Sequence, residues 1–163
     1  MHHQVSKMMK DYPRLIRERE ALKQQLMHFR GISCDEVIES MMTSNSGNEP
    51  VQTSRQTDKT ERIAMSYQEK TERMNREWYD YLERKYHLLD EEITFFEAAL
   101  DSLPEQLPAL MRDMIIHGHT WDSLCEEHHV SRSMLAKHRN KAIEKLSSIY
   151  QRHDEDLLSF MLS

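Results

Sequence analysis

The longest regular pattern of hydrophobic positions lies in the middle of the chain. Its members recur at steps of 4, 4, 3, 4, 3, 4 and 3 residues: Trp78, Leu82, Tyr86, Leu89, Ile93, Phe96, Leu100 and Leu103. This almost unbroken heptad seam predicts one long helix, from about residue 59 to residue 102, that would be roughly 65 Å long. The stretch "DKTE", Asp58 to Glu61, has the order of a capping box and is expected to start the helix.

A second apolar stripe, nearer the N-terminus, predicts a helix from Pro13 to Arg30. Pro13 suits the first helical turn because its missing N–H is not needed there, and Gly31 is expected to end the helix. Arg19 occupies the one polar position of the stripe. The stripe itself consists of Leu15, Leu22, Leu26 and Phe29, and Val5, Met8 and Tyr12 extend it backward through a kinked or broken turn.

The two helices predict a long antiparallel hairpin, a coiled coil, over residues 1–103. The shorter helix would cover only about 27 Å of the longer one. The remainder is therefore expected to pack on a second subunit or on the C-terminal domain, and a homodimer is the simplest assembly. Residues 31–57 are rich in Ser, Thr, Asn and Gln without a period, which predicts a mobile loop with a short helical piece from Cys34 to Met42.

Residues 104–163 are predicted to form a second domain of three helices. The first helix begins near Pro108 and ends at Gly118, which can adopt the left-handed conformation of a helix end. Thr120 is expected to cap a second helix, Trp121 to His128, and Ser131 to cap a third. The inward-facing residues would be Leu110, Met111, Met114 and Ile115 in the first helix, Trp121, Leu124 and Cys125 in the second, and Leu135, His138, Ala142, Leu146 and Ile149 in the third.

The composition agrees with an all-α fold. The 163 residues include only three glycines and four prolines, and 31% of them are charged. Such a composition favours long helices over sheets, and the sequence has no run of alternating β-branched residues between hairpin turns. The fold class expected is therefore an N-terminal helical hairpin followed by a C-terminal helix-turn-helix with a helical tail.

Positive charge gathers on the third C-terminal helix, although the formal charge of the chain is −6. The stretch from Val130 to Leu146 carries five Lys or Arg residues and one acid. A helix fits the major groove of DNA, where Arg and Lys pair with guanine, Asn pairs with adenine and Ser contacts phosphate or base. The predicted DNA-binding residues are Ser131, Arg132, Ser133, Lys137, Arg139, Asn140 and Lys141.

The segment "TWDSLCEEHHVSRSMLAKHRNKAIEKL" resembles, without gaps, the region-four helix-turn-helix of bacterial sigma factors. The shared skeleton consists of Leu124–Cys125, Val130–Ser131 at the turn, Leu135, Ala142 and Lys145–Leu146. The segments "KDYPRLIREREALKQQL" and "VQTSRQTDKTERIAMSY" look like the N-terminal hairpin of phage or prophage sigma-factor-like regulators, the group that includes ArpU-type late-gene activators. The resemblance extends over most of residues 10–150.

This resemblance implies transcription regulation through binding of double-stranded promoter DNA, with RNA polymerase as a further partner. The 163 residues leave no room for the sigma domains that melt promoter DNA or hold the polymerase core, so a complete sigma factor is not expected. The chain also departs from the family at three histidines. His128 and His129 stand where the family usually has an apolar residue and a glycine, and His138 replaces an apolar core residue.

Other function classes fit the sequence less well. A phage assembly protein such as a terminase small subunit also combines a helix-turn-helix with a helical hairpin, but tends to place the DNA-binding part first. A helical adaptor that binds only protein would not explain Arg132, Lys137 and Lys141 on one face. An enzyme is not expected, because the sequence contains no phosphate loop and no nucleophile elbow.

No metal or other cofactor is expected either. The candidate metal ligands in the sequence are His117, His119, Cys125, His128 and His129. Structural zinc sites, however, usually carry two or more cysteines at fixed spacing, and Cys125 is already explained as the small core residue of the motif.

The cysteines and the hydropathy pattern indicate the cellular compartment in which the protein is expected. Cys34 and Cys125 are distant in sequence and do not make a disulfide framework, which favours a reducing environment. The N-terminal residues lack the apolar core of a signal peptide, and no apolar stretch approaches the length of a membrane span. The expected location is the cytoplasm, without a membrane partner.

Overall fold

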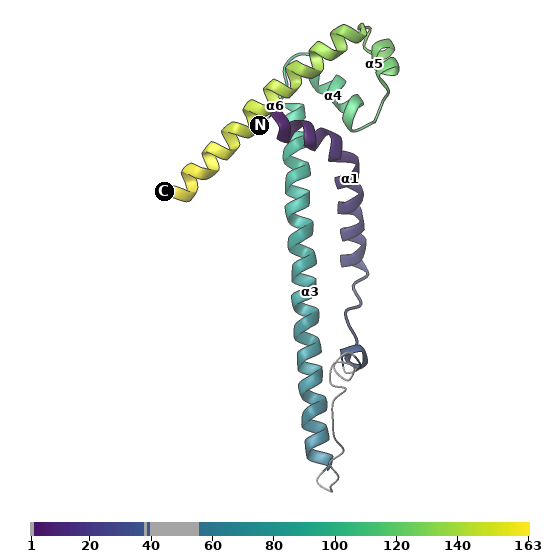
Figure 1. Ribbon diagram of the computed structural model, residues 1–163, viewed down its shortest axis with the longest axis vertical. Coiled ribbons are helices and arrows are strands. Elements are labelled where there is room, and N and C mark those ends of the chain that lie inside the picture. Colours follow the sequence, from purple (N-terminus) through teal and green to yellow (C-terminus); the bar gives the residue numbers. More distant parts are fainter. Residues whose placement is uncertain (1, 38, 40–55) are drawn as a thin grey trace. The chain divides into compact units, whose positions relative to one another are not determined.

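The computed structural model describes residues 2–37, 39 and 56–163, with the backbone alone for residues 56–60. All regular secondary structure in these residues is helical, which confirms the all-α fold class. The named helices are α1 (His2–Met27), α3 (Gln56–Asp101), α4 (Leu107–Ile115), α5 (Trp121–Glu127) and α6 (Arg132–Leu162), as drawn in Figure 1. The chain divides into two compact units, residues 1–20 with 88–163 and residues 21–87.

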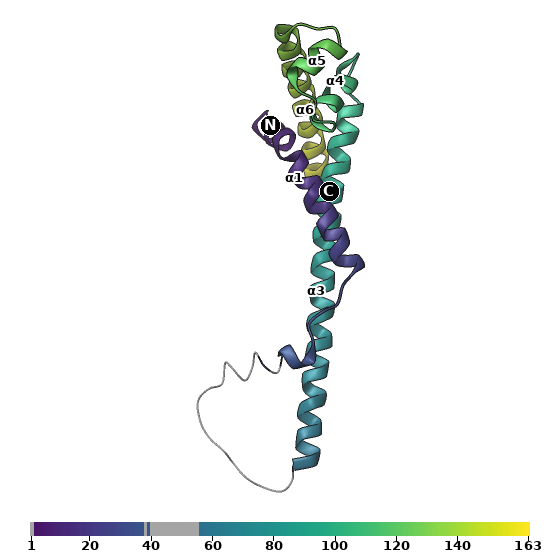
Figure 2. The same cartoon turned by 90° about the vertical axis from the view of Figure 1, so that its right-hand side faces the viewer.

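Helix α1 begins at His2, eleven residues before the predicted start, so that Pro13 lies inside it. The α1 ribbon changes direction partway along its length (Figures 1 and 2). An internal proline explains such a kink, because it removes one backbone hydrogen bond and clashes with the preceding turn, at a cost of about 3 kcal/mol. Burial of Val5, Met8 and Tyr12 offsets that cost, since each large apolar side chain contributes roughly 1.5–3 kcal/mol.

The first part of α1 packs on α3 within the first unit. The Tyr12 ring lies 5.7 Å from the Phe96 ring, and the Tyr12 hydroxyl donates a hydrogen bond to Glu97 Oε1. Arg19, the one polar member of the α1 stripe, pairs with Asp90 at 2.9 Å between Nη1 and Oδ1. The polar position of the α1 stripe is therefore accommodated by an ion pair between Arg19 and Asp90.

The heptad seam of α3 is confirmed in its second half and wrong at its first member. The buried members are Leu82, Leu89, Ile93, Phe96, Leu100 and Leu103, whereas Tyr86 is half-buried. Trp78 is 51% exposed. Helix α3 begins at Gln56, two residues before Asp58, the residue predicted to start it.

The second unit holds the end of α1 and the following turn. Helix α1 ends at Met27, three residues before the predicted end, and Gly31 has a φ of +72°. The Asn75 side chain accepts a hydrogen bond from Ile32 N–H at 2.7 Å and donates one to Ile32 C=O at 3.0 Å. A Cβ at position 31 would lie 2.8 Å from Asn75 Cγ, so both the backbone angle and the close approach require glycine here.

The segment that follows the turn was predicted to contain a short helix within a mobile loop. Residues 34–37 and 39 are helical, and Ser33 and Glu36 cap them reciprocally through Ser33 Oγ and Glu36 Oε2. The rest of the predicted Cys34–Met42 piece and most of the predicted loop, residues 40–55, lie outside the described residues.

Helices α4, α5 and α6 surround a small core, and both views show α4 and α5 beside the N-terminal part of α6 (Figures 1 and 2). The core consists of Leu110, Leu124 and Leu135, against which Met114, Cys125 and Val130 pack. Arg112 of α4 forms a two-bond ion pair with Asp101 at the end of α3, at 2.5 and 2.7 Å. Farther along α6, the Tyr150 ring lies 4.9 Å from the Phe95 ring.

Candidate nucleic-acid interface

The turn between α5 and α6 fixes where the basic helix begins. Ser131 Oγ accepts a hydrogen bond from Met134 N–H at 3.2 Å, which confirms Ser131 as the N-cap of α6. Before it, Val130 N–H donates to Cys125 C=O at 3.1 Å. His129 adopts a φ of +52°, in the left-handed region that favours glycine. The turn is thus closed by backbone bonds at one end and by a side-chain cap at the other.

Helix α5 is also capped as expected but is one residue shorter. Thr120 Oγ1 accepts from Ser123 N–H at 3.2 Å, and the helix ends at Glu127 with His128 as its C-cap. Leu124 is fully buried, whereas Trp121, predicted to face inward, is 38% exposed.

The inward face of α6 follows the predicted register at Leu135, Ala142 and Leu146, which are fully buried. His138 is only half-buried, and its Nε2 lies 3.4 Å from Gln106 Nε2. The buried face continues beyond the prediction through Ile143, Ser147 and Tyr150, because the later part of α6 also packs within the first unit. Ser147 can be buried because its hydroxyl donates to Ile143 C=O at 2.7 Å.

The predicted DNA-binding residues do not all lie on one open face. Ser133, Lys137 and Asn140 are exposed and recur at four- and three-residue steps, so they share one face of α6. Ser131 and Arg132 are exposed at the helix start. Arg139 and Lys141 are half-buried. The structure therefore groups three of the seven residues on one face and places the other four around its margins.

Two of the basic residues already have acidic partners. Arg132 Nη2 lies 2.6 Å from Asp122 Oδ1, and this hydrogen bond raises the pKa of the guanidinium. Lys141 Nζ lies 3.1 and 3.2 Å from the two oxygens of Glu105. Within the part of the chain that the structure describes, Lys137 has no ion-pair partner and Asn140 has no hydrogen-bond partner.

The acidic partners were missed by the sequence analysis. Asp122 precedes Arg132 by ten residues and Glu105 precedes Lys141 by thirty-six, so neither pair has a helical spacing that the sequence would reveal. Only the packing of α4 and α5 on α6 brings them together. Among the predicted DNA-binding residues, Lys137 is consequently the exposed basic residue that is not held beside an acid, whereas Arg132 is held beside Asp122.

Histidines and carboxylates between α4 and α5 form the group that could hold a metal ion. Of the five residues considered in the sequence, His117, His119 and His128 lie beside carboxylates, whereas Cys125 packs on the apolar core. Asp113, His119 and Glu127 offer ligand atoms that all lie within 4.8 Å of one another. Asp113 and Glu127 carried no signal of their own in the sequence, because acidic residues are common along the whole chain.

None of the described helices combines the length and the apolar character that a bilayer crossing requires. Comparisons of the chain with protein-family models, with curated proteins and with solved structures found no match.

Proposed function

We propose that the chain is a sequence-specific, DNA-binding transcriptional regulator of phage or prophage type. In this proposal α4, α5 and α6 act as a sigma region-four-like helix-turn-helix, and the start of α6 enters the major groove. The proposal is supported by two short helices packed on a longer one, with Thr120 and Ser131 as caps at either side of the turn.

The single observation that carries the proposal is the exposed face formed by Ser133, Lys137 and Asn140. Leu135 and Ala142, on the opposite side of the same helical turns, are fully buried. Their burial in the core keeps the face of Ser133, Lys137 and Asn140 turned toward solvent. From Ser133 to Asn140 the helix rises about 10 Å, which is comparable with the width of the major groove, about 12 Å. These three side chains supply hydroxyl, ammonium and amide groups, which are groups that read base edges.

Each residue has a proposed role. Lys137 pairs with guanine or phosphate, and Asn140 reads adenine. Ser131 and Ser133, at the positive end of α6, contact phosphate together with free backbone N–H groups. Arg132 contributes once phosphate replaces Asp122 as its partner, while Arg139 and Lys141 lie at the margin and contribute charge.

The remaining parts of the chain support regulation in this proposal. The helices of residues 1–103 act as a helical hairpin that joins two copies of the chain. RNA polymerase is the protein partner implied by the resemblance to sigma region four. The rival proposal, a DNA-packaging subunit, would require a ring of many copies.

The experiment that tests the proposed function is selection of bound sequences from a random duplex pool, with the mass of the complex measured in parallel. The proposal predicts enrichment of one short sequence and a complex that contains one or two protein chains. Absence of any enriched sequence would contradict it, and a ring of eight or more chains would favour the packaging subunit.

A further inference from the structure

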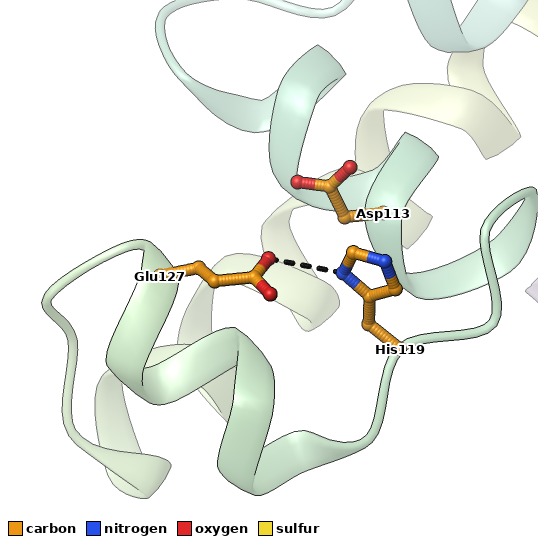
Figure 3. A group of neighbouring side chains, drawn as sticks. All are labelled: Asp113, His119 and Glu127. Carbon is orange, nitrogen blue, oxygen red and sulfur yellow. Dashed lines mark hydrogen bonds and ion pairs between the residues drawn. The ribbon is translucent and has the colours of Figure 1, made fainter.

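A group of titratable side chains lies between α4 and α5 (Figure 3). Asp113 is on α4, His119 is in the connection to α5, and Glu127 is the last residue of α5. One ligand atom from each of the three lies within 4.8 Å of the other two. His119 Nδ1 lies 3.0 Å from Glu127 Oε2, as the dashed line in Figure 3 indicates.

The backbone holds two of these residues together independently of their side chains. His119 N–H donates a hydrogen bond to Asp113 C=O at 2.9 Å. Gly118 precedes His119 with a φ of +68°, a conformation that turns the chain back toward α4. Asp113 and His119 are also half-buried, which limits the movement of both side chains.

Neighbouring side chains hold one oxygen of each carboxylate. Ser123 Oγ donates to Glu127 Oε1 at 2.9 Å, which leaves Oε2 facing His119. His128 Nε2 lies 2.8 Å from Asp113 Oδ2. In metal sites, partners of this kind orient the ligating carboxylates and are needed for full affinity.

The group has two carboxylates, and carboxylates that converge on one point favour a cation between them. His119 lies beside Glu127, and His117 and His128 lie beside Asp113. One imidazole nitrogen and two carboxylate oxygens are a ligand set that suits Zn²⁺ and related divalent transition metals, and three protein ligands leave a further position for water. Atoms bound to one zinc ion lie roughly 3.3 Å apart, so closure from 4.8 Å requires side-chain shifts of about 1 Å.

We propose that Asp113, His119 and Glu127 bind a divalent transition-metal ion that ties α4 to α5. His128 and Ser123 act as positioning residues through the carboxylates that they contact. The site does not rest on the proposed DNA-binding function, since it uses none of the residues assigned to DNA. Its expected effect is to stabilise the packing of α4 and α5, on which the orientation of α6 depends.

Calorimetric titration of the full chain with Zn²⁺ at pH 7.5 tests the site. The expected result is one tight site per chain, with affinity at least tenfold weaker in His119→Ala and in Glu127→Gln. His128→Ala should weaken the affinity by about 10- to 100-fold while leaving the stoichiometry unchanged. Bound Zn²⁺ should also raise the melting temperature of the parent, and Mg²⁺ should bind far more weakly.

Matched variants separate this site from other zinc ligands on the chain. Glu126→Gln removes the same charge from the adjacent, exposed position and should bind Zn²⁺ like the parent. The double variant His2→Ala, His3→Ala removes an adjacent histidine pair and should keep the tight site. Circular dichroism checks that each variant is helical, and Glu127→Gln, an exposed conservative change, covers the case in which His119→Ala does not fold.

Three outcomes would overturn the proposal. The first is a parent that binds no Zn²⁺. The second is unchanged affinity in both His119→Ala and Glu127→Gln. The third is loss of the tight site in the His2→Ala, His3→Ala variant or equal affinity for Mg²⁺.

Discussion

Arg132, the first residue of α6, is paired with Asp122 near the start of α5, with 2.6 Å between Nη2 and Oδ1. Both side chains are largely exposed, at 68% and 76%. An exposed pair of this kind contributes little to stability, because solvent screens it. The carboxylate nevertheless offsets the charge of a residue proposed to contact DNA, so Asp122 competes with phosphate for Arg132.

Asp122→Asn is therefore expected to strengthen DNA binding, because it removes both the competing partner and a negative charge near the duplex. The affinity should rise several-fold, and the dependence of log affinity on log salt should steepen by up to about one unit. Titration of a selected duplex at several salt concentrations measures both. Unchanged affinity and slope would show that Arg132 does not reach DNA, and the gain should vanish in the double variant Asp122→Asn, Arg132→Ala.

His129→Gly is expected to stabilise the turn before α6. His129 has a φ of +52°, and a left-handed conformation costs a non-glycine residue about 1–2 kcal/mol. Glycine avoids this strain but loses more backbone entropy on folding, so the net gain should be about 0.5–1 kcal/mol. Chemical denaturation of the parent and the variant gives the difference. His153→Gly, inside α6, should instead destabilise the protein, and a loss of stability in His129→Gly would contradict the prediction.

Tyr150 is expected to make the protein sensitive to alkali. Burial raises its pKa to about 12, with Glu92 and Asp154 adding to the effect, whereas an unfolded tyrosine titrates near pH 10. The stability from this group is fully present below about pH 10 and is lost as the pH rises toward 12. Tyr150→Phe should therefore reduce the alkaline loss of stability, which thermal melts between pH 8 and about pH 11 would follow.

At neutral pH the same substitution should be neutral or stabilising. Among the described residues the buried Tyr150 hydroxyl has no hydrogen-bond partner, so its removal leaves no donor or acceptor unsatisfied. Tyr12→Phe is the matched comparison, because the Tyr12 hydroxyl donates to Glu97, and it should cost about 1 kcal/mol. A larger loss of stability in Tyr150→Phe than in Tyr12→Phe would contradict this account.

Self-association is expected to use an exposed stripe of α3 rather than the buried seam. Ile93 is fully buried within a single chain, so it is not available to a partner. Tyr67, Met74 and Tyr81 recur every seven residues, and Trp78 lies beside them. Tyr67 and Met74 are half-buried, whereas Trp78 and Tyr81 are 51% and 54% exposed. Such a repeat is typical of a coiled-coil contact.

Tyr81→Glu should accordingly lower the mass of the assembly from dimer to monomer, because it places a charge in the proposed contact. Arg76→Glu introduces the same side chain on the other side of α3 and should leave the mass unchanged. Sedimentation measurements of the parent and both variants provide the test. A parent that sediments as a compact monomer at high concentration would contradict the prediction of a homodimer.

The sequence revealed those features that depend on local pattern. Thr120 and Ser131 could be recognised as caps because a helix start needs a side-chain acceptor, and Leu135, Ala142 and Leu146 could be turned inward by helical spacing. The half-burial of His138 was not foreseen, because it depends on Gln106 from another element.

Features that depend on packing between distant elements could not be read from the pattern. The start of α1 was placed too late because Pro13 suits a first turn, whereas burial of the preceding stripe decides where the helix begins. Asp122 beside Arg132 and Glu105 beside Lys141 change the available charge of the candidate site, and neither pair follows a spacing along one helix. Trp78 belongs to the regular seam and is nevertheless exposed. The spacing of a hydrophobic repeat does not show how far along the repeat the partner helix extends.

The account is tested most directly by titrating a selected duplex with the parent, Lys137→Ala, Asn140→Ala and Arg152→Ala at two salt concentrations. Arg152 is exposed on the same helix, well away from the proposed face, and its removal matches the charge lost at Lys137. Lys137→Ala and Asn140→Ala should each weaken binding by about 1–3 kcal/mol without unfolding the protein, and Arg152→Ala should bind like the parent. Equal binding by all four proteins at both salt concentrations would contradict the claim that this face of α6 reads DNA.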